Sequence, residues 1–164
     1  QYMLGDSLLV APVMNPDSIG EYYLPEGTWT NFFTQEQREG GRWYEEPCGY
    51  LEIPLWVRPN TVLALGSRED TPEYAYEEGT VFRIYALEEG ITAGTVVCGM
   101  DQTEKRRLTA QRDGNRIRIT SEGTGTYTVE LIRVIATAVE GAAYQVLEDR
   151  TVLDGCGGSV SVTL

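Results

Sequence analysis

Residues 106–120 read RRLTAQRDGNRIRIT, and this stretch decides the fold class. Asp113-Gly114 is typical of two-residue hairpin turns, because both residue types tolerate the positive φ angles that such turns require. Apolar and polar residues alternate on the return segment, so Ile117 and Ile119 share one face of a strand. The stretch therefore predicts a β-hairpin with one buried face.

The same alternation recurs on both sides of this hairpin. Phe82 and Ile84 share a face of one segment, and Tyr127, Val129 and Leu131 share a face of another. No long segment shows helical periodicity, and short β-branched runs are separated by glycine and other turn residues. We therefore predict an all-β fold built from antiparallel sheets.

The chain of 164 residues is long enough for two small domains. A stretch with little apolar content runs from Gly66 to Thr80 and contains Asp70 and Pro72. Such a composition is typical of a linker. We predict two small antiparallel β-sandwich domains in tandem, at residues 1–66 and 67–164.

Composition excludes several kinds of chemistry. The sequence has no histidine, which removes the commonest general base and excludes a Ser–His or Cys–His nucleophile within the chain. Cys48, Cys98 and Cys156 are separated by 50 and 58 residues, a spacing that matches no zinc pattern. We expect no metal and no cofactor, and interpret the cysteines as reduced thiols, with one disulfide as the alternative.

Charge and hydropathy limit the partners. The formal net charge is −12, which argues against nucleic acid, because phosphate neutralisation requires a positive field. The longest apolar runs, such as Leu8–Val13, are too short to span a bilayer, so we expect no membrane partner. No basic segment precedes an apolar stretch near Gln1, so nothing there predicts a signal peptide. The interpretation of the cysteines as reduced thiols predicts a cytoplasmic protein.

Four blocks in the first third carry a family resemblance. Residues 1–13 read QYMLGDSLLVAPV, residues 23–31 read YLPEGTWTN, residues 41–43 read GRW, and residues 55–66 read LWVRPNTVLALG. In this order they resemble the start of the carboxyl-terminal region of glycoside hydrolase family 31, and the wording is most similar to its bacterial α-xylosidases and to its α-glucosidases. Residues 67–164 resemble the distal β-sandwich of that family by position and strand pattern.

The resemblance implies a role as well as a fold. Residues 1–5 would be the remnant of the last helix of the catalytic (β/α)₈ barrel, followed by the proximal and distal β-sandwich domains. The chain would be a non-catalytic accessory part of a retaining α-glycosidase, with the barrel as its partner and the oligosaccharide substrate reached through the parent enzyme. The two catalytic aspartates of the family lie on barrel strands that precede Gln1. The chain itself is therefore expected to be inactive, and whether it forms a homo-oligomer is left open.

Two residues are candidates for positions near the substrate. Asp6 lies in Gly5-Asp6-Ser7, where it is either a carboxylate facing the substrate side of the barrel or a turn residue that accepts backbone hydrogen bonds. Trp43 follows the Gly40-Gly41 pair, and its ring would either stack on a sugar or fill the core. Two other functions stay open for the whole chain, a carbohydrate-binding module and an assembly domain.

Two other tryptophans lie within predicted strands. We assign Trp29 and Trp56 to the core rather than to a sugar-binding surface, because aromatic side chains in strands contribute the most buried area to a sandwich.

Overall fold

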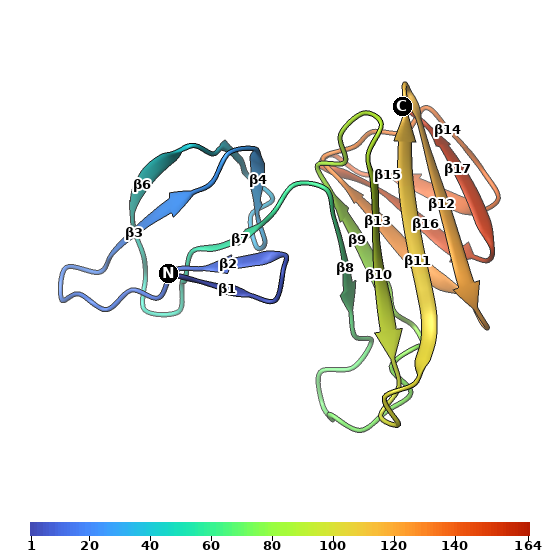
Figure 1. Ribbon diagram of the computed structural model, residues 1–164, viewed down its shortest axis with the longest axis horizontal. Coiled ribbons are helices and arrows are strands. Elements are labelled where there is room, and N and C mark those ends of the chain that lie inside the picture. Colours follow the sequence, from blue (N-terminus) through green and yellow to red (C-terminus); the bar gives the residue numbers. More distant parts are fainter. The chain divides into compact units, whose positions relative to one another are not determined.

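The computed structural model describes residues 1–164 and consists of strands and loops without any helix. The chain divides into two compact units, Gln1–Pro59 and Asn60–Leu164 (Figure 1). The all-β prediction is confirmed. The structure thus holds no helical segment that could traverse a membrane.

The first unit holds one five-stranded sheet, in the order β1-β2-β7-β4-β5, and a two-stranded ribbon, β3-β6. All of its strand pairs are antiparallel. Its strands are β1 (Tyr2–Leu4), β2 (Leu8–Val10), β3 (Ile19–Leu24), β4 (Thr28–Asn31), β5 (Gln37–Glu39), β6 (Arg42–Pro47) and β7 (Leu55–Val57).

Aromatic side chains fill the core of the first unit. Trp29 and Trp56 are almost completely buried, which confirms their assignment to the core. The Tyr22 ring lies 5.9 Å from the Trp56 ring and stacks on Tyr44 at the same centroid separation. Aromatic rings bury more area than other side chains, and Tyr22, Trp29 and Trp56 are the largest members of this core of six residues.

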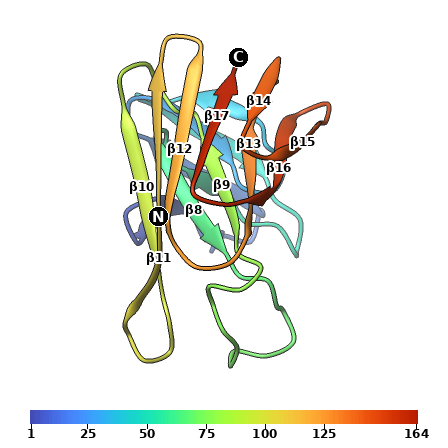
Figure 2. The same ribbon diagram turned by 90° about the vertical axis from the view of Figure 1, so that its right-hand side faces the viewer.

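The second unit contains two five-stranded sheets, ordered β10-β11-β12-β17-β14 and β15-β16-β13-β9-β8. Figure 2 shows β12 and β17 side by side in the first of these sheets. The strands are β8 (Thr61–Leu65), β9 (Val81–Tyr85), β10 (Thr92–Cys98), β11 (Glu104–Asp113), β12 (Arg116–Gly123), β13 (Tyr127–Ile132), β14 (Ala138–Glu140), β15 (Ala143–Val146), β16 (Arg150–Cys156) and β17 (Ser159–Thr163).

The predicted hairpin is formed by β11 and β12. Asp113 is opposite Arg116, and Gly114 takes a φ of 57° in the turn between them. Ile117 and Ile119 are buried among the eighteen residues of the core of the second unit, as their alternation predicts. The burial of one face of each strand, and not local propensity alone, holds this register.

The structure departs from the expectations in three places. Residues 2–4 form β1 rather than the end of a helix, because Tyr2 pairs with Val10 and Gly5 closes a turn between strands at a φ of 62°. Strand β8, expected in the first domain, pairs with β9, so the compact units divide after Pro59 rather than at residue 66. Finally, β9 and β13 are parallel, so the second unit is not purely antiparallel.

Candidate functional site

Large apolar side chains are unusually exposed in the first unit. Tyr50 and Leu51 are almost fully exposed, and three consecutive residues of β1 are exposed together. These large exposed apolar side chains make the unit a candidate for an interaction site. The exposed set comprises Tyr2, Met3, Leu4, Met14, Phe33, Trp43, Tyr50 and Leu51.

Strand β1 is exposed because it is the edge of its sheet and pairs only with β2. The side chain of Gln1 fixes its start, since Gln1 Nε2 donates to the carbonyl of Tyr23 at 3.0 Å and Gln1 Oε1 accepts from the Tyr23 N–H at 2.7 Å. These two bonds tie the edge hairpin to the β3–β6 ribbon. Its apolar side chains are thus held in place without being covered.

Asp6 lies in the turn between β1 and β2 and is exposed. Its carboxylate makes neither a hydrogen bond nor an ion pair, and the turn is held instead by the Arg58 N–H, which donates to the carbonyl of Ser7 at 2.9 Å. The interpretation of Asp6 as a turn residue that accepts backbone hydrogen bonds is therefore not supported by any such bond. The carboxylate is free to accept hydrogen bonds from a neighbouring group.

Trp43 lies on β6, directly opposite Tyr23 on β3. The two ring centroids are 5.7 Å apart and the rings are tilted by 59°, while 65% of Trp43 remains exposed. Trp43 therefore belongs to the surface rather than to the core. Asp6 and Trp43 lie in different sheets and no interaction joins them.

A partly buried polar cluster around Arg38 joins strands β3, β5 and β6. The Arg38 guanidinium donates to the Tyr22 hydroxyl at 2.6 Å and pairs with Glu46 at 2.8 Å, and Tyr22 donates to Glu46 at 2.9 Å. The guanidinium also faces the rings of Tyr44 and Trp56, at 5.1 and 4.8 Å from their centroids. Burial, and then the Glu46 carboxylate, raise the pKa of Tyr22 well above its ordinary value.

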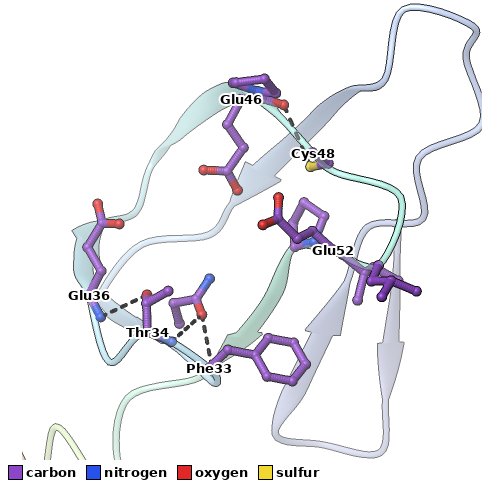
Figure 3. Close-up of a pocket in the computed structure, with 11 residues that line it drawn as sticks. Phe33, Thr34, Glu36, Glu46, Cys48 and Glu52 are labelled. Carbon is purple, nitrogen blue, oxygen red and sulfur yellow. Dashed lines mark hydrogen bonds between the residues drawn. The ribbon is translucent and has the colours of Figure 1, made fainter.

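A hollow of about 300 Å³ adjoins this cluster in the first unit. Figure 3 shows Glu46 and Glu52 extending their carboxylates into it, while the Phe33 ring lies at its edge. Glu52 accepts the Gly49 N–H at 2.7 Å. The lining consists of Asn31, Phe33, Thr34, Glu36, Glu46, Pro47, Cys48, Leu51, Glu52, Ile53 and Pro54.

This hollow offers hydrogen-bond acceptors over apolar walls but no nucleophile with a base beside it. Glu46 already binds Tyr22 and Arg38, and burial raises the pKa of the Cys48 thiol. No group of three His, Cys, Asp or Glu residues is placed to hold a metal ion. The sequence analysis did not single out Glu46, although the strand period places it on the same face as Tyr44.

Comparison with known proteins identifies the class to which this arrangement belongs. Residues 1–63 match the model of the glycosyl hydrolase family 31 C-terminal domain. Residues 75–164 match the model described as alpha-xylosidase YicI, C-terminal domain. The chain therefore belongs to glycoside hydrolase family 31 and corresponds to its carboxyl-terminal region.

Individual relatives agree with this assignment. The α-xylosidase XylQ of Lactiplantibacillus pentosus is 30% identical over 135 residues, which are 79% of this chain and 17% of XylQ. The GH31 dextranase of Flavobacterium johnsoniae, complexed with glucose, shares the fold with a TM-score of 0.79 at 15% identity, over 99% of this chain and 26% of that chain. The GH31 α-xylosidase of Xanthomonas citri gives a TM-score of 0.66 at 21% identity, over 100% and 19%. The chain thus spans less than a fifth of the length of XylQ.

Proposed function

We propose that this chain is the non-catalytic accessory carboxyl-terminal part of a retaining α-glycosidase that hydrolyses O-glycosyl bonds. It packs on the catalytic barrel of the parent enzyme and supports it. The α-xylosidase type is favoured over the α-glucosidase type because the model matched by residues 75–164 and the relative XylQ are both described as α-xylosidases. The proposal places the enzyme in the cytoplasm, where an exposed free thiol such as Cys98 persists.

The exposed apolar surface of the first unit carries this proposal. Leu4 and Tyr2 are each more than half exposed on an edge strand whose backbone is otherwise fixed. Burial of such side chains against a neighbouring domain stabilises both by about 25 cal/mol per Å² of apolar area. A supporting domain matters for catalysis because displacement of about 1 Å at an active site costs on the order of a hundredfold in rate.

The test substitutes Leu4 by Lys in the full-length enzyme that carries this chain. We expect the variant to lower kcat/KM for an aryl α-glycoside on the order of tenfold and to lower the melting temperature, because a charge would be buried at the barrel interface. Ile91→Lys is the control, since Ile91 is an exposed apolar residue of the second unit, although less exposed than Leu4. Equal and small effects of both substitutions would argue against the proposal.

A carbohydrate-binding module is the second candidate, and the Tyr23–Trp43 pair favours it. Exposed aromatic rings held by a strand pair can stack on sugar faces, and these two rings are already fixed relative to one another. Calorimetric titration of the chain with xylo- and malto-oligosaccharides tests this function. No heat at millimolar ligand would discard it.

A further inference from the structure

The exposed apolar side chains of the second unit are concentrated in one segment of the sequence, which includes strand β15. Of the six large apolar side chains exposed in this unit, four lie within residues 135–147, namely Ile135, Tyr144, Val146 and Leu147. All four residues of β15 are exposed. Figure 2 shows β14 and β15 at one side of the sandwich, next to the β13 and β16 strands. This surface lies in a different unit from the one assigned above to the barrel.

The backbone of β15 is unpaired along one side. β15 pairs only with β16 and ends its sheet. The Leu147 N–H donates to the Arg150 carbonyl at 2.8 Å, which makes this the hydrogen-bonded pair that closes the hairpin. Hydrogen-bonded and non-hydrogen-bonded pairs alternate along an antiparallel ladder. Gln145 therefore directs its N–H and C=O toward β16, whereas Tyr144 and Val146 direct theirs away from the sheet.

The other ends of the two sheets differ from this edge. At the far side of the sandwich, the end strands β8 and β10 lie against each other and so limit access to both. Strand β14 carries Glu140, a charge of the kind that discourages edge pairing. Residues 141–147 contain no charge and no proline, so the β15 edge has no such protection.

We propose that β15 is a self-association edge that pairs antiparallel with β15 of a second copy of this chain. A twofold axis at Gln145 would place Tyr144 opposite Val146 of the other copy, and Val146 opposite its Tyr144. Both residues direct their N–H and C=O outward, so the two pairs would exchange four hydrogen bonds. An aromatic residue opposite a β-branched residue is also a favourable cross-strand pair.

Charge favours a second copy at this edge over other surfaces. Two copies with a net charge of −12 each repel one another over most of their surface. In the proposed register, residues 143–147 of the two copies face one another without any charge. Glu148 falls opposite Ala142 and Asp149 opposite Gly141, so no carboxylate faces another carboxylate. The edge thus offers a place where backbone groups of two copies can meet without like-charge repulsion.

Sedimentation velocity over a concentration series tests the proposal on the protein as its gene encodes it. We expect a monomer–dimer equilibrium for the native protein and a dissociation constant at least tenfold higher for Val146→Pro. Proline removes the outward N–H of residue 146 but none of the hydrogen bonds to β16, so the second unit should fold normally. Val146→Thr keeps the N–H and the β-branched shape, and should dimerise like the native protein.

A second variant covers the case in which proline disturbs the fold. Tyr144→Lys places a charge on the edge strand, keeps its backbone, and should also abolish dimerisation. The thermal unfolding of each variant shows whether it is folded. A native protein that stays monomeric, or folded Val146→Pro and Tyr144→Lys variants that dimerise as the native protein does, would overturn the proposal.

Discussion

The two units of this chain differ in how many of their apolar side chains are buried and how many are exposed. The first unit, Gln1–Pro59, has a core cluster of six buried residues, whereas the second, Asn60–Leu164, has eighteen. Yet the smaller unit exposes eight large apolar side chains and the larger unit only six. In the smaller unit the exposed large apolar side chains outnumber the buried residues of the core cluster, whereas in the larger unit the buried residues are in the majority.

The difference teaches which unit is self-sufficient. A domain of about 60 residues buries only about 60% of the surface of its unfolded chain and is marginally stable alone, while a domain of about 100 residues buries more. The first unit compensates in part through the Arg38 cluster, in which the guanidinium bridges β5 to Glu46 on β6 and to Tyr22 on β3. Covering its apolar surface with a neighbouring domain would supply the remaining stabilisation.

The largest expected effect comes from separating the two units. We expect residues 60–164, expressed alone, to unfold cooperatively, because the core of eighteen residues lies wholly within them. We expect residues 1–59 alone to lack a cooperative transition, since six buried residues cannot offset the conformational entropy of the chain. Circular dichroism melts and amide proton dispersion in NMR spectra of both pieces provide the measurement.

The whole chain of 164 residues serves as the control. Its thermal melt should include the unfolding transition that residues 60–164 show alone. A cooperative melt of residues 1–59 alone would falsify the contrast drawn between the units.

Truncation of one phenylalanine in each unit tests the contrast at the level of single side chains. Phe82 is completely buried and meets the Tyr127 ring edge-on at 5.6 Å, so Phe82→Ala should lower the free energy of unfolding by about 3–5 kcal/mol. Phe33 is 61% exposed, and Phe33→Ala should cost no more than about 1 kcal/mol in the same chain. Urea unfolding measures both. Similar losses for the two variants would show that Phe33 is covered in solution.

Much of the fold could be predicted from the sequence, because strand alternation and turn chemistry are local signals. The Asp113-Gly114 hairpin and the burial of Trp29 and Trp56 followed from such patterns. The parallel pairing of β9 with β13 and the edge strand β1 could not be predicted in this way. The β9–β13 pairing depends on which distant segment lies alongside, and the residues themselves do not encode this locally. Strand β1 forms a local hairpin with β2, but the family resemblance predicted the end of a helix for residues 1–5.

The candidate site was harder to predict for the same reason. The sequence singled out Asp6 and Trp43, and the structure leaves both exposed, in different sheets. The hollow formed by residues 31–36 and 46–54 could not be predicted from the sequence, because two separate segments form it and no sequence motif marks either of them. Whether either residue lies near a substrate depends on the barrel and stays a prediction.

Alkaline pH should destabilise the second unit through Cys156. Burial, and then the charge of Asp154, raise the pKa of its thiol from an ordinary value of 9.0 to about 11. Between these values the unfolded chain releases the proton while the folded chain retains it, so stability falls as pH rises from about 9 to about 11. Urea unfolding under reducing conditions across this range should show a smaller decline for Cys156→Ala.

Cys98→Ala is the matched control, because Cys98 is exposed. This variant should keep the slope of the native chain. If Cys156→Ala loses stability with pH as steeply as Cys98→Ala does, the thiol of Cys156 does not contribute to the decline.

The smallest effect on stability is expected for Trp43→Ala, which makes it useful for separating two roles of the first unit. Trp43 is mostly exposed and contacts Tyr23, so its loss should cost less than about 1 kcal/mol in this chain. If Trp43 lies near the substrate, Trp43→Ala should raise KM for xylo-oligosaccharides in the full-length enzyme and leave the melting temperature unchanged. If Trp43 packs on the barrel, Trp43→Ala should instead lower the melting temperature, as Leu4→Lys should. An unchanged KM for Trp43→Ala would therefore remove Trp43 from the substrate side and leave barrel packing as the function of the exposed aromatic surface.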